Sequence, residues 1–335
     1  MIRTFSHPHP FSLELGQQLP AIEVAYQVWG ENPDHPVIWI CHALTANSDA
    51  FDWWQGLVGE GKLIDPARYQ IVCANMLGSC YGSTYALHEN PATGIPYYDR
   101  FPHLTNRDIA LGFDLLREHL GINKVYCLIG GSLGGQQLLE WAILRPQVFE
   151  KIVPIATNAR HSPWGIAFNE SQRMAIAADS SWGEHDPEAG LQGMEVARSI
   201  ALLSYRNYQT YLTTQLEADD EKVSDFRATT YQRYQGKKLR KRFDAFAYWT
   251  LSRAMDSQHL GRGRSSVQQA LHLIQANTLV VGVNSDLLFP VSEQQFLAEH
   301  IPRARYQEIH SLYGHDGFLL EFEQLEQILQ PFLES

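Results

Sequence analysis

Short apolar runs alternate with helical patterns over the first half of the chain and again near its end. The runs are rich in β-branched and apolar residues and end in glycine or polar turns, which is typical of buried parallel strands. They span residues 37–43, 69–76, 125–131, 151–158 and 278–286. Helical patterns cover 109–121 and 133–146, and Pro146 ends the second of them. This alternation predicts an α/β fold with a mostly parallel sheet flanked by helices.

The pattern changes in the middle of the chain, where strand-like runs disappear and polar, helix-favouring stretches such as 195–223 take their place. Strand-like texture returns at Thr278, so the helical part is predicted to be inserted between two parts of one sheet. We therefore expect a core in two parts, residues 1–159 and 273–335, with a helical cap at 160–272.

Composition and charge narrow the class of protein. The chain has 335 residues, of which 44% are hydrophobic and 19% charged, as in a compact globular enzyme. Its net charge of −11 repels phosphate backbones and anionic lipids, so neither nucleic acid nor a membrane is an expected partner. The N-terminus lacks a signal-peptide pattern and no long apolar run follows, which predicts a cytoplasmic protein.

The cysteines and histidines do not indicate a metal site. Cys41, Cys73, Cys80 and Cys127 are widely spaced and form no CxxC pair, so free thiols in a reducing compartment are predicted. His7 and His9 near the N-terminus have no partners arranged for a metal. We expect no bound metal.

The glycine-rich hexapeptide at 130–135, with the sequence GGSLGG, is the most informative motif. It follows a predicted strand directly and precedes a predicted helix. Strand, G-x-S-x-G turn and helix together describe a nucleophile elbow, a strained turn that holds a serine hydroxyl exposed. The alternative is a glycine-rich turn with an incidental serine. We interpret Ser132 as a catalytic nucleophile.

A serine nucleophile needs a base, and the base needs a partner that fixes its orientation. In this fold the chain order is serine, acid, histidine. Asp286 ends a predicted strand, and His315 lies in the glycine-flanked loop before the last helix. Asp316 is the rival for the role of the acid, but as the neighbour of His315 it is better suited to contact the substrate.

An acyl transfer also needs donors for the oxyanion that forms at the reacting carbonyl. In this fold one donor is the backbone N–H after the nucleophile, here Leu133. The second is expected from the loop at 41–46, with the Leu44 amide as the candidate. Without Ser132 this loop would be interpreted as an ordinary strand exit.

Taken together, these motifs resemble one family, the homoserine O-acyltransferases of the α/β-hydrolase fold, which begin methionine synthesis by acylating homoserine from acyl-CoA. The resemblance covers almost the whole chain. It is carried by HALT (42–45), WWQGLVGEGKLID (53–65), NMLGSCYGST (75–84), GGSLGGQQLLEW (130–141), VARSIALLSYR (196–206), RFDAFAYWTLSRAMD (242–256), GRGR (261–264), NSDLLFP (284–290) and YGHDGFL (313–319).

The resemblance implies a ping-pong reaction in which Ser132 takes an acyl group, with acetyl favoured over succinyl, from acyl-CoA and passes it to homoserine. His315 would be the base in both steps. Arg198 would bind the α-carboxylate of homoserine and Asp316 its α-ammonium group. Arg206 competes for the first role, and Arg198 could instead be a solvated helix residue. The resemblance further implies a homodimer, and no cofactor besides the acyl-CoA co-substrate.

Several alternatives remain open from the sequence. The loop that contains Tyr81 and Tyr85 departs from the family pattern, where a basic residue and a GSTGP-like ending are usual. Serine or another alcohol as the acceptor, succinyl-CoA as the donor, an esterase and a non-catalytic binding protein of the same fold are therefore alternatives. The basic run 237–242 either attracts CoA phosphates or is a solvated helix face.

Overall fold

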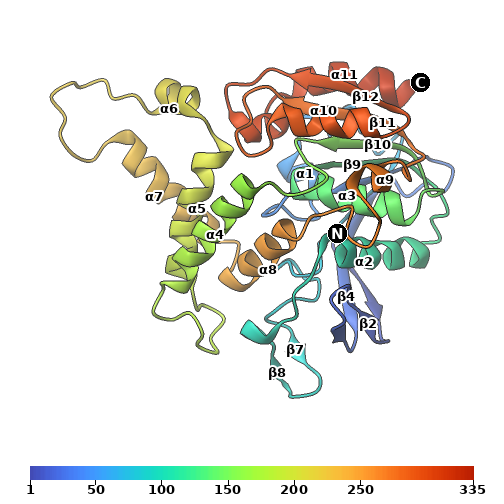
Figure 1. Cartoon of the computed structure of the whole chain (residues 1–335), viewed down its shortest axis with the longest axis horizontal. Coiled ribbons are helices and arrows are strands. Elements are labelled where there is room, and N and C mark those ends of the chain that lie inside the picture. Colours follow the sequence, from blue (N-terminus) through green and yellow to red (C-terminus); the bar gives the residue numbers. More distant parts are fainter.

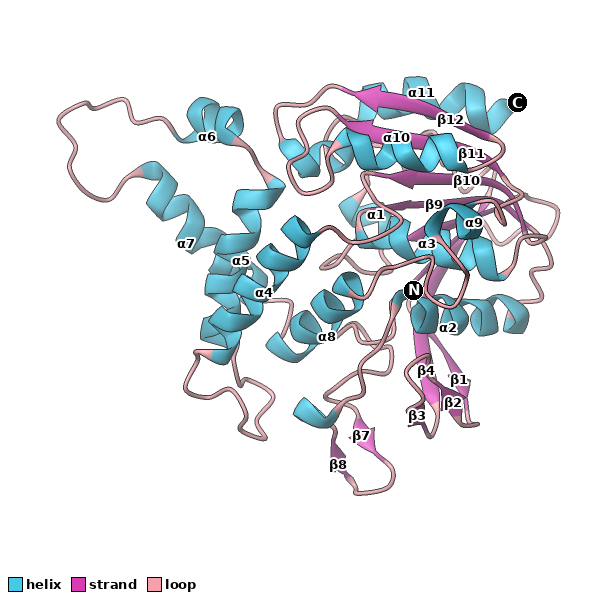
Figure 2. Ribbon diagram, in the orientation of Figure 1, coloured by secondary structure: helices cyan, strands magenta, loops and turns pink.

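The computed structural model describes residues 1–335 and contains an eight-stranded sheet with the order β1-β4-β6-β5-β9-β10-β11-β12 (Figures 1 and 2). Its strands are β1 (Arg3–His7), β4 (Ile22–Trp29), β5 (Val37–Cys41), β6 (Gln70–Ala74), β9 (Val125–Gly131), β10 (Phe149–Ile155), β11 (Asn277–Val283) and β12 (Ala304–Ile309). Two small hairpins pair β2 (Phe11–Ser12) with β3 (Gln18–Leu19) and β7 (Glu89–Asn90) with β8 (Ile95–Pro96).

The strands from β6 to β12 in the sheet order run parallel, whereas β4 is antiparallel to both of its neighbours. The five strands predicted from apolar runs are β5, β6, β9, β10 and β11, and all are present. β1, β4 and β12 were not predicted. β12 is an edge strand in which partly buried and exposed residues alternate, so it has no continuous apolar run.

Helices cover both faces of the sheet. On one face lie α2 (Asn106–His119), α3 (Leu133–Leu144) and α10 (Val291–His300), and on the other α1 (Ala50–Trp53) and α11 (Phe322–Glu334). Side chains of one strand alternate between two hydrophobic clusters, so that Trp39 of β5 points to the first and Ile38 and Ile40 to the second. The predicted sheet with helices on both sides is confirmed.

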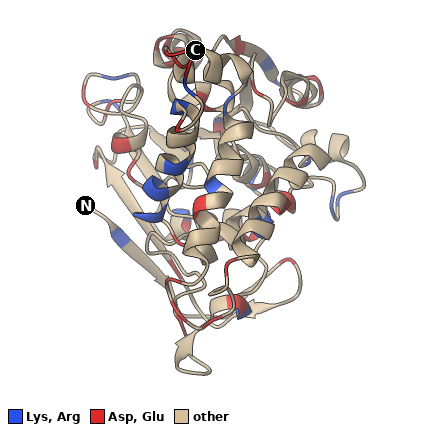
Figure 3. Ribbon diagram, turned by 90° about the vertical axis from the view of Figure 1, so that its left-hand side faces the viewer, with Lys and Arg blue, Asp and Glu red and all other residues tan.

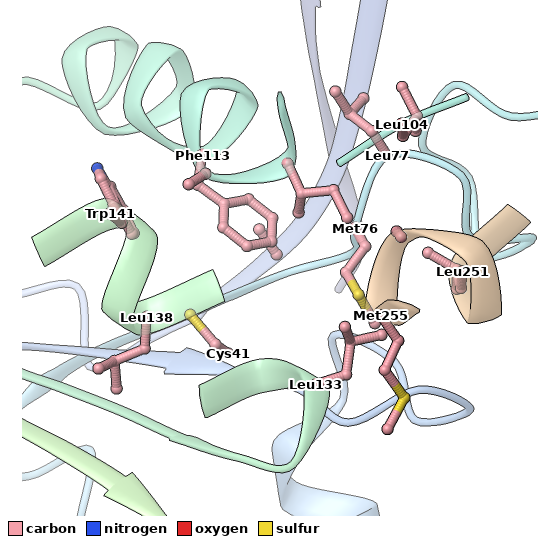
Figure 4. Packing of buried hydrophobic residues seen from close by; sticks show 14 of the residues in the cluster. Cys41, Met76, Leu77, Leu104, Phe113, Leu133, Leu138, Trp141, Leu251 and Met255 are labelled. Atoms are coloured by element: carbon pink, nitrogen blue, oxygen red, sulfur yellow. The ribbon is translucent and has the colours of Figure 1, made fainter. Parts of the chain in front are cut away.

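Two helices that matter for the site are well specified by sequence. α2 begins with a capping box, in which the Thr105 side chain accepts a hydrogen bond from the Asp108 N–H and the Asp108 carboxylate accepts one from the Thr105 N–H. α3 is almost entirely buried, consistent with its apolar sequence. Figure 4 shows Met76 and Met255 gathered around Leu133, the first residue of α3. The start of α3 is therefore held firmly in the core.

The segment between β10 and β11 is helical and stands beside the sheet, with α6 and α7 farthest from it (Figures 1 and 2). Its helices are α4 (Pro163–Ala177), α5 (Leu191–Tyr205), α6 (Tyr208–Gln215), α7 (Arg227–Arg240), α8 (Ala245–Asp256) and α9 (Val267–Leu271). The predicted absence of strands here is confirmed apart from an isolated bridge between Arg160 and His259. The division into domains at residues 160 and 272 stays a prediction.

Two further sequence-based expectations concern the thiols and membranes. All four cysteines are free, and Cys41, Cys73 and Cys127 are buried. Burial also raises the pKa of the Cys80 thiol to about 12, so the prediction of unpaired, unreactive thiols holds. None of the helices has both the length and the apolar character needed to cross a membrane.

Candidate active site

Ser132 lies at the carboxyl end of β9 in a strained conformation. Its φ of 58° and ψ of −127° are unusual for a residue with a side chain. The turn is fixed from both sides: the Ser132 N–H donates to the carbonyl of Ile155 at 3.0 Å, and the Thr157 hydroxyl donates to the carbonyl of Ser132 at 2.8 Å. The hydroxyl of Ser132 itself makes no hydrogen bond within the protein. This conformation is the one expected of a nucleophile elbow.

The small residues around Ser132 permit a close approach of three chain segments. A Cβ at Gly134 would overlap the carbonyl oxygen of Cys41, and one at Gly130 would lie 2.7 Å from the carbonyl oxygen of Gly134. No larger side chain fits at either position unless the backbone moves. The elbow is therefore packed directly against the end of β5, which leads into the loop that carries Leu44.

Asp286 and His315 form a buried hydrogen-bonded pair. Asp286 follows β11 and His315 lies in the 3-10 helix η2 (Gly314–Leu319), which follows β12. The Nδ1 of His315 donates to Oδ2 of Asp286 at 2.6 Å. The other carboxylate oxygen accepts from the backbone N–H groups of Leu288 and Phe289 at 2.8 and 2.9 Å. Asp286, not Asp316, is thus the carboxylate bonded to the histidine.

The His315 ring is placed next to the elbow through Phe318. The ring centroids of His315 and Phe318 are 5.4 Å apart, and a Cβ at Gly131 would overlap the Phe318 ring. The rings of Phe289 and Tyr205 also lie within 5.1 and 5.7 Å of the imidazole. With Nδ1 bonded to Asp286, the Nε2 of His315 is left without a partner in the protein. That nitrogen is the one a serine hydroxyl would use.

The electrostatic surroundings favour the charged form of His315. Burial lowers the pKa of the imidazole, but the charge of Asp286 and its hydrogen bond, together with the charge of Asp316, raise the pKa above its usual value overall. An imidazolium that forms during a reaction is therefore stabilised where it forms. A base of this kind remains neutral, and able to accept a proton, only above its raised pKa.

Two backbone N–H groups beside the elbow have no hydrogen-bond partner. One belongs to Leu133, the first residue of α3, and the other to Leu44 in the turn after β5. The loop that carries Leu44 is fixed by His42, whose Nδ1 lies 2.9 Å from the carbonyl of Ala43 and whose Nε2 accepts from the Met76 N–H at 3.3 Å. Burial lowers the pKa of His42 to about 4, so its ring is neutral. Both expected oxyanion donors are thus free.

The charged residues near His315 are divided between paired and unpaired groups. Arg206 forms an ion pair with Asp316, with 3.0 Å between Nη2 and Oδ2. Arg198 has no acidic partner in the structure, and its guanidinium lies 5.3 Å from the centre of the Tyr205 ring. Tyr205 in turn contacts the His315 ring, so Arg198 is one side chain away from the histidine. Of the two arginines considered from sequence, Arg198 is the one left free for an anion.

Sequence reasoning did not identify several residues that position the site. His42 lies in the HALT motif, but nothing in the sequence showed that it fixes the loop with Leu44. Phe318 and Tyr205 link His315 to the elbow and to Arg198, respectively. The pairing of Arg206 with Asp316 depends on how the helical segment sits against η2. No group of three or more His, Cys, Asp or Glu side chains is placed to hold a metal ion.

The sequence is similar to known proteins along nearly its whole length. A family model for the alpha/beta hydrolase fold matches residues 36–322. A homoserine O-acetyltransferase from Cyclobacterium marinum is 50% identical over 324 residues, which cover 96% of this chain and 92% of the relative. The chain belongs to the homoserine O-acetyltransferase family.

Solved structures agree with this family assignment. The crystal structure of a homoserine O-acetyltransferase from Staphylococcus aureus is 30% identical and has a TM-score of 0.83, covering 100% of this chain and 95% of that one. Esterase E22 is 24% identical, covers 99% of both chains, and has a TM-score of 0.89, which shows the shared fold alone. The predicted α/β-hydrolase fold and family resemblance are confirmed.

One departure from the family pattern now has a structural setting. The hydroxyl of Tyr81 accepts a hydrogen bond from Nη1 of Arg242 at 2.8 Å. The same nitrogen also donates to the carbonyl of Thr45, the residue after Leu44. In this member of the homoserine O-acetyltransferase family, Tyr81 thus brings a cation from the helical segment to the loop beside the elbow.

Proposed function

We propose that the protein transfers an acetyl group from acetyl-CoA to the hydroxyl of L-homoserine in methionine biosynthesis, through an acetyl ester on Ser132. The observation that carries the chemistry is the 2.6 Å hydrogen bond between His315 and Asp286 beside a strained serine turn. The choice of acetyl and homoserine is supported by the relative from Cyclobacterium marinum, which is named a homoserine O-acetyltransferase.

In the first half of the reaction, the oxygen of Ser132 attacks the thioester carbonyl while Nε2 of His315 takes the hydroxyl proton. The negative charge that develops on the carbonyl oxygen accepts hydrogen bonds from the N–H groups of Leu44 and Leu133. The carbon–sulfur bond then breaks, and the proton on His315 passes to the departing CoA thiolate. Asp286 stabilises the imidazolium between these transfers.

In the second half, homoserine replaces CoA at the same base. Nε2 of His315 takes the proton of the homoserine hydroxyl, whose oxygen attacks the acetyl carbonyl on Ser132. The same two N–H groups hold the second oxyanion. When the ester bond to Ser132 breaks, the proton returns from His315 to the serine oxygen. The enzyme is restored and O-acetylhomoserine is released.

The charges around His315 suit an amino-acid acceptor. Arg198 lacks an acidic partner and is available to bind the α-carboxylate with two parallel hydrogen bonds. Asp316 is adjacent to His315 in sequence and keeps one carboxylate oxygen, Oδ1, beyond its ion pair with Arg206. We therefore assign the α-carboxylate to Arg198 and the α-ammonium group to Asp316, with Arg206 holding Asp316 in place.

A panel of donors and acceptors tests this function. Acetyl-CoA and succinyl-CoA are each combined with homoserine, with serine and with water alone, and release of free CoA thiol is followed. The proposal predicts rapid release only with acetyl-CoA and homoserine together, because a transferase site must exclude water from the acetyl-serine. Equal rates with and without homoserine would indicate an esterase, and a preference for serine or succinyl-CoA would change the acceptor or the donor.

We also propose that the protein acts in the cytoplasm as a homodimer whose helical segments are in contact. Large apolar side chains are exposed on and after α5 and α6, where they would be covered by a partner. They include Val196, Leu203, Tyr208, Leu212, Leu216 and Val223. Sedimentation at several protein concentrations tests this proposal, and a monomer at all of them would contradict it.

A further inference from the structure

The end of α7 and the two residues after it carry an unusual concentration of positive charge. Five of the six residues from 237 to 242 are Lys or Arg, in a chain whose net charge is −11. Figure 3 looks at the helical segment and shows Lys and Arg gathered along one helix, whereas Asp and Glu are scattered. Such a cluster of like charges is costly unless an anion is bound there.

Most of these cations have no acidic partner. Arg240 pairs with Glu195 at 3.1 Å, and Gly236 packs against the backbone of the same glutamate. That side of α7 therefore faces α5. Lys237, Lys238 and Lys241 are exposed and form no ion pair or hydrogen bond within the protein. With a turn of 100° per residue, these three lysines share the side of the helix that faces away from α5.

The inner end of this basic cluster reaches the active site. Arg242 donates hydrogen bonds to the Tyr81 hydroxyl and to the carbonyl of Thr45. Thr45 follows Leu44, whose N–H is a proposed donor to the reacting carbonyl. The ring of Tyr81 also packs against Phe243, with centroids 5.8 Å apart. Lys237, Lys238, Lys241 and Arg242, which we name the basic strip, thus lead outward from the loop beside the elbow.

The chemistry of an acyl-CoA matches this arrangement. Its thioester stands at one end of a long, flexible arm that contains two amides, and its phosphates stand at the other end. When the thioester carbonyl meets the Leu44 N–H, the arm has to leave the site past neighbouring groups. A guanidinium is well suited to an amide carbonyl close to the thioester, and lysine ammonium groups to phosphates farther out.

We propose that the basic strip binds the donor, with Arg242 contacting the arm of CoA and Lys237, Lys238 and Lys241 binding its phosphates. This inference rests on the proposed function, because it assigns the binding site of that reaction's donor. Binding at the strip adds no chemical step. It raises the local concentration of the anionic donor at the mouth of the site in a protein that otherwise repels anions.

The test compares two acetyl donors on a variant that lacks the three lysines, K237A/K238A/K241A. One donor is acetyl-CoA, and the other is the acetyl thioester of N-acetylcysteamine, which has the same reacting group but no phosphates. Arg242 is kept, because its loss would also disturb the loop at Thr45. We expect kcat/KM for acetyl-CoA, divided by kcat/KM for the small thioester, to fall about tenfold through a higher KM for acetyl-CoA.

A control with the same change in charge is K62A/R68A/R303A, whose residues are exposed elsewhere on the molecule. It should keep the wild-type ratio. Salt should also raise the KM for acetyl-CoA more steeply in the wild type than in the lysine variant. A wild-type ratio in K237A/K238A/K241A, or an equal loss with both donors, would overturn the assignment of the strip.

The two proposals fail in different ways. A wild-type protein that transfers no acetyl group from either donor contradicts the proposed function. Calorimetric titration of CoA into the wild type and into K237A/K238A/K241A then examines the strip without turnover. Weaker binding by the variant supports phosphate binding at the strip, and equal affinity overturns it.

Discussion

At the scale of single residues, the site depends on two carboxylates that have different partners. Asp286 is bonded to Nδ1 of His315, while the neighbouring Asp316 is held by Arg206. Each carboxylate therefore has a separate task, one on the base and one toward the substrate. The two neutral N–H groups of Leu44 and Leu133 are left to meet the developing negative charge.

Replacing Asp286 by Asn tests the role of the acid. Because Asp286 raises the pKa of His315 against the effect of burial, its loss should lower that pKa. The base is active when neutral, so the acid limb of kcat/KM should move to lower pH, while turnover falls by a factor on the order of 10⁴. A pH profile of kcat/KM measures both effects. An unchanged limb, or one displaced upward, would contradict the assignment.

Replacing Arg198 by Ala tests the carboxylate site. The loss of a charge-assisted, two-fold hydrogen bond should raise the KM for homoserine by about 10- to 100-fold. Release of CoA in the first half-reaction should be affected much less, because the donor does not contact Arg198. Arg233 is an exposed arginine of α7 without an ion pair, and Arg233→Ala serves as the control. A homoserine KM close to the wild-type value in Arg198→Ala would reject this role.

At the scale of elements, the elbow depends on the contact between the start of α3 and the end of β5. The Ser132 conformation is strained, and it persists because the surrounding elements hold it. Gly134 is the point of closest approach, since its Cα lies against the carbonyl of Cys41. The same contact sets Leu133 beside the loop with Leu44. The proposed oxyanion site is therefore as rigid as this contact.

Substituting Gly134 by Ala tests that contact. The added methyl group would overlap a backbone carbonyl, so we expect a loss of about 3 kcal/mol in the free energy of unfolding and a marked loss of activity. Gly112→Ala in α2 is the control, because its Cβ would meet only the end of the Leu77 side chain, at 3.0 Å. That change should cost less than about 1 kcal/mol. Denaturant unfolding of both variants provides the comparison, and equal stabilities would contradict the account.

At the scale of the whole molecule, the sequence predicted what lies near recognisable strands. Ser132 and Asp286 were found because each ends an apolar strand. β12 escaped prediction because it is an edge strand with alternating exposure. The pairing of Arg206 with Asp316 and the link from Arg242 to Thr45 also escaped, because both depend on where the helical segment rests on the core. Local patterns carry no information about such long-range contacts.

The pH dependence of stability is also a property of the whole molecule, and Glu293 near the base of the site contributes to it. Burial, together with the charge of Asp286, raises its pKa to about 7 from 4.5, although a hydrogen bond from Asn158 opposes the rise. Stability from this group is therefore present below about pH 4.5 and is lost as the pH rises through 7.

Glu293→Gln should therefore stabilise the protein at pH 8 but not at pH 4.5. Glutamine keeps an acceptor for Asn158 and carries no charge, so we expect a gain of about 1 kcal/mol at the higher pH after allowance for solvent screening. Thermal unfolding at both pH values measures the gain. Glu299→Gln, at an exposed position of the same helix, should show little change at either pH. A gain at pH 4.5 alone would have the wrong sign.

The central claim is that Ser132 carries the acetyl group, and mass spectrometry of the enzyme after mixing with acetyl-CoA alone tests it most directly. The account predicts an added acetyl group on the peptide that contains Ser132, its removal on addition of homoserine, and no such adduct in Ser132→Ala. An enzyme that stays unmodified during active turnover, or an acetyl group on another residue that homoserine removes, would contradict it.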